Sequence, residues 1–154
     1  MNQTGLVIIK SMGIGDLVIL ISNIHAISKS IKSKVVVLAQ KNTRAAEVLK
    51  YDPHVSEIID LDKKGFFNII KKIKRKNFKK SYIYSDSLRL FLISKLSNIK
   101  ENYQYKLFSK KGKNFFKTAK KFTEKTLNYE INHESKIYWD PEEVEKAKIK
   151  FKIS

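Results

Sequence analysis

The chain has 154 residues, a length that suits one domain with its own hydrophobic core. It contains no cysteine, which excludes disulfides and thiolate metal sites and fits a reducing compartment such as the cytoplasm. No signal peptide is apparent, and no apolar stretch is long enough to predict a membrane span. The formal net charge of +17 favours an anionic partner, such as nucleic acid, an anionic lipid surface or a phosphorylated sugar.

The positive charge is concentrated in the middle of the chain. Residues 63–125 carry 20 basic and 3 acidic side chains, whereas the segments on either side are nearly balanced. Selection for anion binding would produce such a segment. Codon bias in an AT-rich genome would also produce it, because lysine supplies 29 of the 32 basic residues. Both explanations stay open at this stage.

Strand-like and helix-like segments alternate along the chain. A β-branched run at residues 6–9 predicts a strand buried on both faces, and apolar residues at helical spacing predict a helix from Leu17 to residue 31. Further strands are predicted at residues 34–39, 55–61 and 80–85, and further helices at residues 43–49, 65–76 and 88–96. This alternation predicts an α/β fold, a parallel sheet with helices on both faces.

The last third of the chain has weaker patterns. Alternating tyrosines at residues 102–107 predict one more strand. Residues 109–125 are rich in lysine, and their phenylalanines fall on one helical stripe. That spacing favours a helix with an apolar face over a site for single-stranded nucleic acid. An Asp-Pro pair at residues 140 and 141 predicts the start of a final helix.

A glycine-containing turn separates the first strand from the first helix, and Asp16 follows it. In open parallel sheets, ligands bind at the carboxyl ends of the strands, so Asp16 is the leading candidate for a functional carboxylate. Aspartate is also a preferred N-cap residue, and capping alone would explain it. The turn is not a nucleotide loop, because Val18 occupies the third glycine position of GxGxxG and no GK[ST] is present.

The three histidines, His25, His54 and His133, are scattered, and their spacing is not that of metal ligands. We therefore interpret them as ordinary surface or core residues, and we expect no metal site.

Three segments in order, KSMGIGDLV, YDPHVSEIIDLD and SYIYSDSLRLFLISKLS, resemble the first half of glycosyltransferase family 9. This family contains the ADP-heptose:lipopolysaccharide heptosyltransferases. The resemblance covers residues 6–108 and implies the amino-terminal half of a GT-B fold, in which two Rossmann-like domains face a cleft. Residues 1–140 would form the acceptor-binding domain, and residues 141–154 would begin the interdomain linker helix. The donor-binding domain would be absent, so the 154 residues alone are expected to be inactive.

The resemblance also implies roles for particular residues, without a cofactor or a metal. Asp16 matches the proposed catalytic base. Ser87 and Arg89 match an acceptor-side motif, and Lys63 and Lys64 would meet acceptor phosphates unless they are only a solvated charge run. The loop that places Asp16 would be shaped by Ser11, Met12, Gly13 and Gly15, and Lys10 would meet an anionic acceptor or pair with Asp16.

The implied partners are an anionic glycan or glycolipid acceptor and a nucleotide-sugar donor, ADP-heptose, held by the missing domain. The implied location is the cytoplasm, with peripheral contact at the inner face of the inner membrane; nucleic acid is not expected as a partner. Two alternatives stay open. One is a basic module that binds nucleic acid or an anionic membrane through residues 63–125, and the other is a non-functional truncated remnant.

Overall fold

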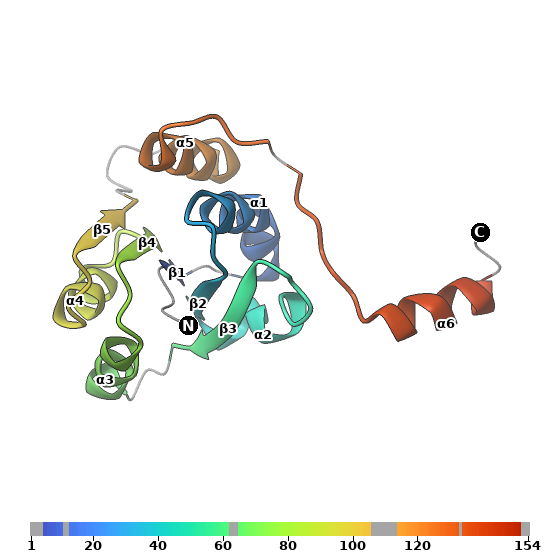
Figure 1. The fold of residues 1–154 in the computed structure, drawn as a ribbon, viewed down its shortest axis with the longest axis horizontal. Helices are drawn as coiled ribbons and strands as arrows, with labels where there is room; N and C mark the ends of the chain where they lie inside the picture. Colours follow the sequence, from blue (N-terminus) through green and yellow to red (C-terminus); the bar gives the residue numbers. More distant parts are fainter. Residues whose placement is uncertain (1–4, 11–12, 62–64, 106–113, 133, 152–154) are drawn as a thin grey trace.

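The computed structural model describes residues 5–10, 13–61, 65–105, 114–132 and 134–151 (Figure 1). Five parallel strands form one sheet in the order β3-β2-β1-β4-β5. Their bounds are β1 (Gly5–Ile9), β2 (Val35–Ala39), β3 (Val55–Asp60), β4 (Lys80–Tyr84) and β5 (Glu101–Gln104). The predicted parallel α/β sheet is therefore confirmed, and the architecture is Rossmann-like.

Helices follow the strands along the chain. They are α1 (Ile14–Ser30), a short 3-10 turn η1 (Lys41–Thr43), α2 (Ala45–Val48), α3 (Phe66–Lys76), α4 (Leu88–Leu96), α5 (Phe115–Leu127) and α6 (Pro141–Phe151). In Figure 1, α1 and α5 lie on one side of the sheet, and α3 and α4 lie on the other. The prediction of helices on both faces is confirmed.

The hydrophobic core has two layers because successive side chains of a strand point to opposite faces. Val7 and Ile9 pack with α1, α2 and α5, whereas Leu6 and Ile8 pack with α3 and α4. All five residues of β1 are buried. The continuous apolar run that predicted a strand covered on both faces follows from this central position.

The first helix begins at Ile14, three residues before the predicted start at Leu17. The amide of Leu17 already donates to the carbonyl of Gly13 at 3.4 Å, which closes the first helical turn. Ile14 and Gly15 are exposed. Apolar periodicity reports the part of a helix that contacts the core, so an exposed first turn gives no such signal.

The strand order reverses between β1 and β4. The chain passes from β1 to β2 in one direction and later returns to β4 on the other side of β1. The last residues of the two strands, Ile9 and Tyr84, are paired. The helices that follow these strands, α1 and α4, go to opposite faces, so their first turns flank a topological switch point.

After α5, the chain runs back across α1 as an extended segment. The hydroxyl of Tyr129 donates to the carbonyl of Ala26 at 2.9 Å, and the hydroxyl of Ser135 donates to the carbonyl of Val18 at 3.0 Å. Helix α6 then projects from the body and has no buried residue (Figure 1).

Candidate functional site

The candidate site lies at the carboxyl edge of the sheet, around the switch point. Lys10 leaves β1 there and is exposed, next to the point where Ser85 leaves β4. The structure thus brings Lys10, Asp16 and Ser87 to one edge of the sheet. Ser11, Met12, Lys63 and Lys64 lie outside the described residues.

Asp16 is the third residue of α1 and lies in its first turn. The N-cap position belongs to Gly13, so Asp16 lies near the N-cap rather than at it. A carboxylate in the first turn is favoured by the helix dipole. Asp16 is only partly buried.

The two glycines of the turn are not required by packing within the protein. A Cβ added to Gly13 or to Gly15 would meet open space. The backbone of Gly13 is extended, with φ 179°, a conformation that any residue adopts. The free space beside both residues would allow a ligand to approach the backbone closely at the start of α1.

The loop before α4 is held by a residue that the sequence patterns did not single out. The side-chain amide of Gln104, the last residue of β5, donates to the carbonyls of Ser85 at 3.0 Å and Ser87 at 3.2 Å. The amide of Ser87 donates to the Ser85 hydroxyl at 3.2 Å. Ser87 is the N-cap residue of α4, and its own hydroxyl makes no capping hydrogen bond. The one feature of the sequence that could have pointed to Gln104 is that it is a polar residue inside the predicted tyrosine-rich strand.

Arg89 is exposed in the first turn of α4. Its guanidinium carbon lies 5.7 Å from the centre of the Phe66 ring, so the side chain spans from α4 to the first turn of α3.

Within the described ranges, no group of three or more His, Asp or Glu side chains could hold a metal ion. In the same ranges, no helix has the length and the apolar content to cross a bilayer.

Solved structures share this arrangement of strands and helices. A glycosyltransferase family 9 protein from Veillonella parvula DSM 2008 superposes with a TM-score of 0.72 over 100% of this chain, at 13% sequence identity. The fold of this chain is that of glycosyltransferase family 9 structures. ADP-heptose lipopolysaccharide heptosyltransferase II from E. coli superposes with a TM-score of 0.63 over 99% of the chain, at 15% identity.

The chain spans 51% of the length of each of these two structures. No protein-family model and no curated protein matches its sequence. At such low identity the likeness to family 9 structures concerns the fold, and roles for individual residues have to be argued from their chemistry.

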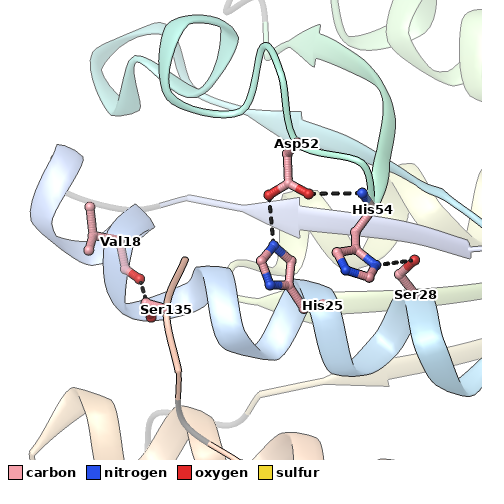
Figure 2. A network of polar contacts seen from close by, with 6 residues as sticks. All are labelled: Val18, His25, Ser28, Asp52, His54 and Ser135. Carbon is pink, nitrogen blue, oxygen red and sulfur yellow. Dashed lines mark hydrogen bonds and ion pairs between the residues drawn. The ribbon is translucent and has the colours of Figure 1, made fainter. Parts of the chain in front are cut away.

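A second polar cluster of this family 9 fold lies at the opposite, amino edge of the sheet (Figure 2). His25 Nε2 and Asp52 Oδ2 are 2.7 Å apart, and both side chains are buried. The other carboxylate oxygen accepts from the backbone amide of His54 at 2.9 Å. His54 Nδ1 lies 3.3 Å from the hydroxyl of Ser28. His25 is a buried core residue and His54 is half-buried, in line with the interpretation of ordinary surface or core residues, and the fold brings the two together; His133 lies outside the described residues.

This cluster is a clasp between α1 and the start of β3 rather than a catalytic relay. The hydroxyl of Ser28 donates to the carbonyl of Ser33 at 2.9 Å, and the hydroxyl is buried. Asp52 accepts a hydrogen bond from the backbone amide of His54 and none from its ring, so among the described residues no carboxylate is hydrogen-bonded to that imidazole to orient it as a base. Burial and the nearby charge of His25 lower the pKa of His54 from its ordinary value.

Proposed function

We propose that this chain is the amino-terminal, acceptor-binding domain of an inverting glycosyltransferase similar to the heptosyltransferases. The enzyme would transfer a sugar, heptose from ADP-heptose, to a lipopolysaccharide-core or related glycan. The observation that carries the proposal is the position of Asp16, which is partly exposed in the first turn of α1, at the switch point of a family 9 fold.

Asp16 is proposed as the general base. Its carboxylate would take the proton of the acceptor hydroxyl while the hydroxyl oxygen forms a bond to the anomeric carbon of the donor sugar. The bond between that carbon and the diphosphate oxygen would break at the same time, and the nucleoside diphosphate would leave with the bonding electrons. Attack from the face opposite the leaving group inverts the anomeric centre, as in other inverting reactions at this carbon.

The residues around Asp16 would bind the acceptor. Lys10 and Arg89 are exposed cations suited to an anionic glycan, and the Ser87 hydroxyl is a hydrogen-bond partner for a sugar hydroxyl. The open space beside Gly13 and Gly15 would admit the sugar ring. Ser11, Met12, Lys63 and Lys64 keep their predicted roles in the loop and in phosphate contact.

The nucleotide sugar would be bound by a second, carboxy-terminal domain, and residues 141–154 would begin the linker to it. The proposal therefore includes that these 154 residues alone turn over no donor. The acceptor would be an anionic glycolipid, and the enzyme would work in the cytoplasm at the inner face of the inner membrane.

The test joins the chain, after α6, to the donor-binding half of E. coli heptosyltransferase II. In this two-domain chimera, Asp16→Asn is expected to lower transfer from ADP-heptose by about 100-fold to 10,000-fold. Asp86→Asn is the matched control, because Asp86 is an exposed carboxylate at the same sheet edge. Equal activity of the Asp16→Asn and Asp86→Asn chimeras would remove Asp16 from the mechanism.

A binding measurement tests the same site without turnover. An acceptor oligosaccharide titrated into the 154-residue chain is expected to shift the amide resonances of Gly13, Gly15, Asp16, Ser87 and Arg89. Shifts confined to other parts of the chain would contradict the proposed acceptor site.

Two of the phenylalanines that lie between the lysines of residues 109–125 are used for packing, which takes support from the nucleic-acid alternative. The rings of Phe115 and Phe122 in α5 pack edge-on against Tyr105, and Phe122 also packs against Tyr84. Rings that are used in the core offer no platform on which bases could stack.

A further inference from the structure

The outer side of α3 carries an exposed aromatic ring followed by a row of cations. Phe67, Lys71, Lys74 and Arg75 share one face of the helix, since they are spaced by about one and two turns. All four are exposed, and Phe67 is 79% exposed. Ile69 and Ile73 are buried on the opposite side of the helix and anchor it to the sheet. We call these four residues the α3 patch.

The carboxylate of Glu57 pairs with two lysines beside the α3 patch and not with the cations of the patch itself. Glu57 of β3 lies 3.6 Å from the ammonium of Lys72 and accepts a hydrogen bond from Lys76. Both of those lysines lie beside the patch. In the described part of the chain, no carboxylate forms an ion pair with Lys71, Lys74 or Arg75. With respect to the carboxylates that the structure describes, the patch therefore keeps three positive charges for a partner.

A second exposed apolar side chain lies in the neighbouring helix. The contact between Arg89 and the Phe66 ring places the first turn of α4 beside the first turn of α3. Leu88, in that turn of α4, is 69% exposed. Figure 1 shows α3 and α4 side by side on the same face of the sheet. Two large apolar side chains and a row of cations are thus presented along one side of the molecule.

We propose that the α3 patch, together with Leu88, is a contact surface for an anionic lipid bilayer. Phe67 and Leu88 would enter the interfacial layer, and the cations would meet the lipid phosphates. Two large exposed apolar side chains, one of them aliphatic, gain most from leaving water for the interfacial layer, so the combination favours lipid over nucleic acid. The first turn of α3 lies at the same sheet edge as Asp16, so a bilayer bound there would hold the site near a membrane-anchored acceptor. This role of the contact rests on the proposed function.

Helix α5 provides a matched control on the opposite face of the sheet. It also carries three exposed lysines, Lys117, Lys121 and Lys125. Its most exposed aromatic residue, Phe116, is only 37% exposed. Attraction by net charge alone would depend equally on both helices.

The experiment measures co-sedimentation of the 154-residue chain with vesicles. One set contains phosphatidylglycerol mixed with phosphatidylcholine, and the other contains phosphatidylcholine alone. The chain should bind the anionic vesicles and lose binding as salt is raised. The triple variant Lys71→Gln, Lys74→Gln, Arg75→Gln should partition about 100-fold more weakly. Phe67→Ser should weaken partitioning about ten-fold.

The control variant Lys117→Gln, Lys121→Gln, Lys125→Gln loses the same charge and should bind much more tightly than the α3 variant. Equal losses in both triple variants would overturn the proposal, and so would retention on RNA or DNA without retention on anionic vesicles. Because the assay needs neither donor nor turnover, its outcome is separate from that of the Asp16→Asn test.

Discussion

The imidazole of His25 and the carboxylate of Asp52 meet at 2.7 Å in the interior of the protein, 27 residues apart in the chain. Together with the backbone amide of His54, they join the middle of α1 to the turn that leads into β3 (Figure 2). The extended segment after α5 passes over the same place, where the Tyr138 ring lies 6.0 Å from the His25 ring. The clasp therefore ties three separate parts of the chain together at the edge of the sheet opposite Asp16.

Replacing Asp52 should destabilise the fold strongly. Asp52→Ala removes the acceptor of two hydrogen bonds and leaves the buried His25 unpaired, which we expect to lower the free energy of unfolding by about 3 kcal/mol. Glu47→Ala is the control, because the Glu47–Arg44 pair is exposed and the substitution should change stability far less than Asp52→Ala does. Urea unfolding of the two variants measures the difference. Similar midpoints would show that the clasp contributes little.

Acid should weaken the clasp through His54. The pKa of His54 is lowered in the folded state, chiefly by burial and next by the charge of His25. The charge of Asp52 raises the pKa, and the charges of Lys29 and Lys34 lower it further. The folded state therefore favours the neutral ring. This contribution to stability is complete above the unfolded pKa of about 6.5 and is lost as the pH falls below it.

The measurement is the free energy of unfolding at several pH values between about 8 and 5. His54→Gln should flatten the decline on the acid side, since glutamine does not titrate. Tyr129→Phe, which removes a nearby hydrogen bond to Ala26 without changing a group that titrates in this range, should lower stability equally at every pH. An unchanged slope in His54→Gln would assign the acid sensitivity to other groups.

Replacing Gly15 with alanine should raise the stability of the fold while weakening acceptor binding. Alanine has the higher helix propensity and its Cβ would meet open space, so Gly15→Ala should raise stability by about 0.5–1 kcal/mol. In the two-domain chimera, the same methyl group should raise the KM for the acceptor, because it fills the space proposed for the sugar. Gly5→Ala is the contrasting variant, since its Cβ would lie 2.7 Å from Ile31 Cδ1 and the end of that side chain would have to shift, so no gain in stability is expected. Unaltered acceptor kinetics in Gly15→Ala would place the sugar elsewhere.

Gln104 should order the start of α4. Gln104→Glu keeps the size of the side chain but removes the two donated hydrogen bonds to Ser85 and Ser87. Amide hydrogen exchange at residues 87–90 is expected to rise by about ten-fold, whereas exchange in α1 stays unchanged. A uniform rise across the protein would instead indicate global destabilisation.

Local patterns in the sequence were sufficient to predict the architecture, a parallel sheet with helices on both faces. The buried run of β1 and the helical spacing of isoleucines in α1 are properties of short segments, and they depend only on which face is covered. They also placed Asp16 between a strand and a helix, which is enough to locate it at the carboxyl edge of a parallel sheet. The resemblance of three ordered segments to family 9 pointed to the fold that the solved structures share.

Only the tertiary structure decided which distant residues meet. His25 and Asp52 come from different crossover units, and the Thr123 hydroxyl lies 2.7 Å from Asn23 Oδ1 although 100 residues separate them. Gln104 reaches the loop after β4 because β5 is the next strand in the sheet, a neighbour relation that no local pattern contains. Such pairs depend on the strand order and the hand of the crossovers, so they exist only once the whole sheet has formed.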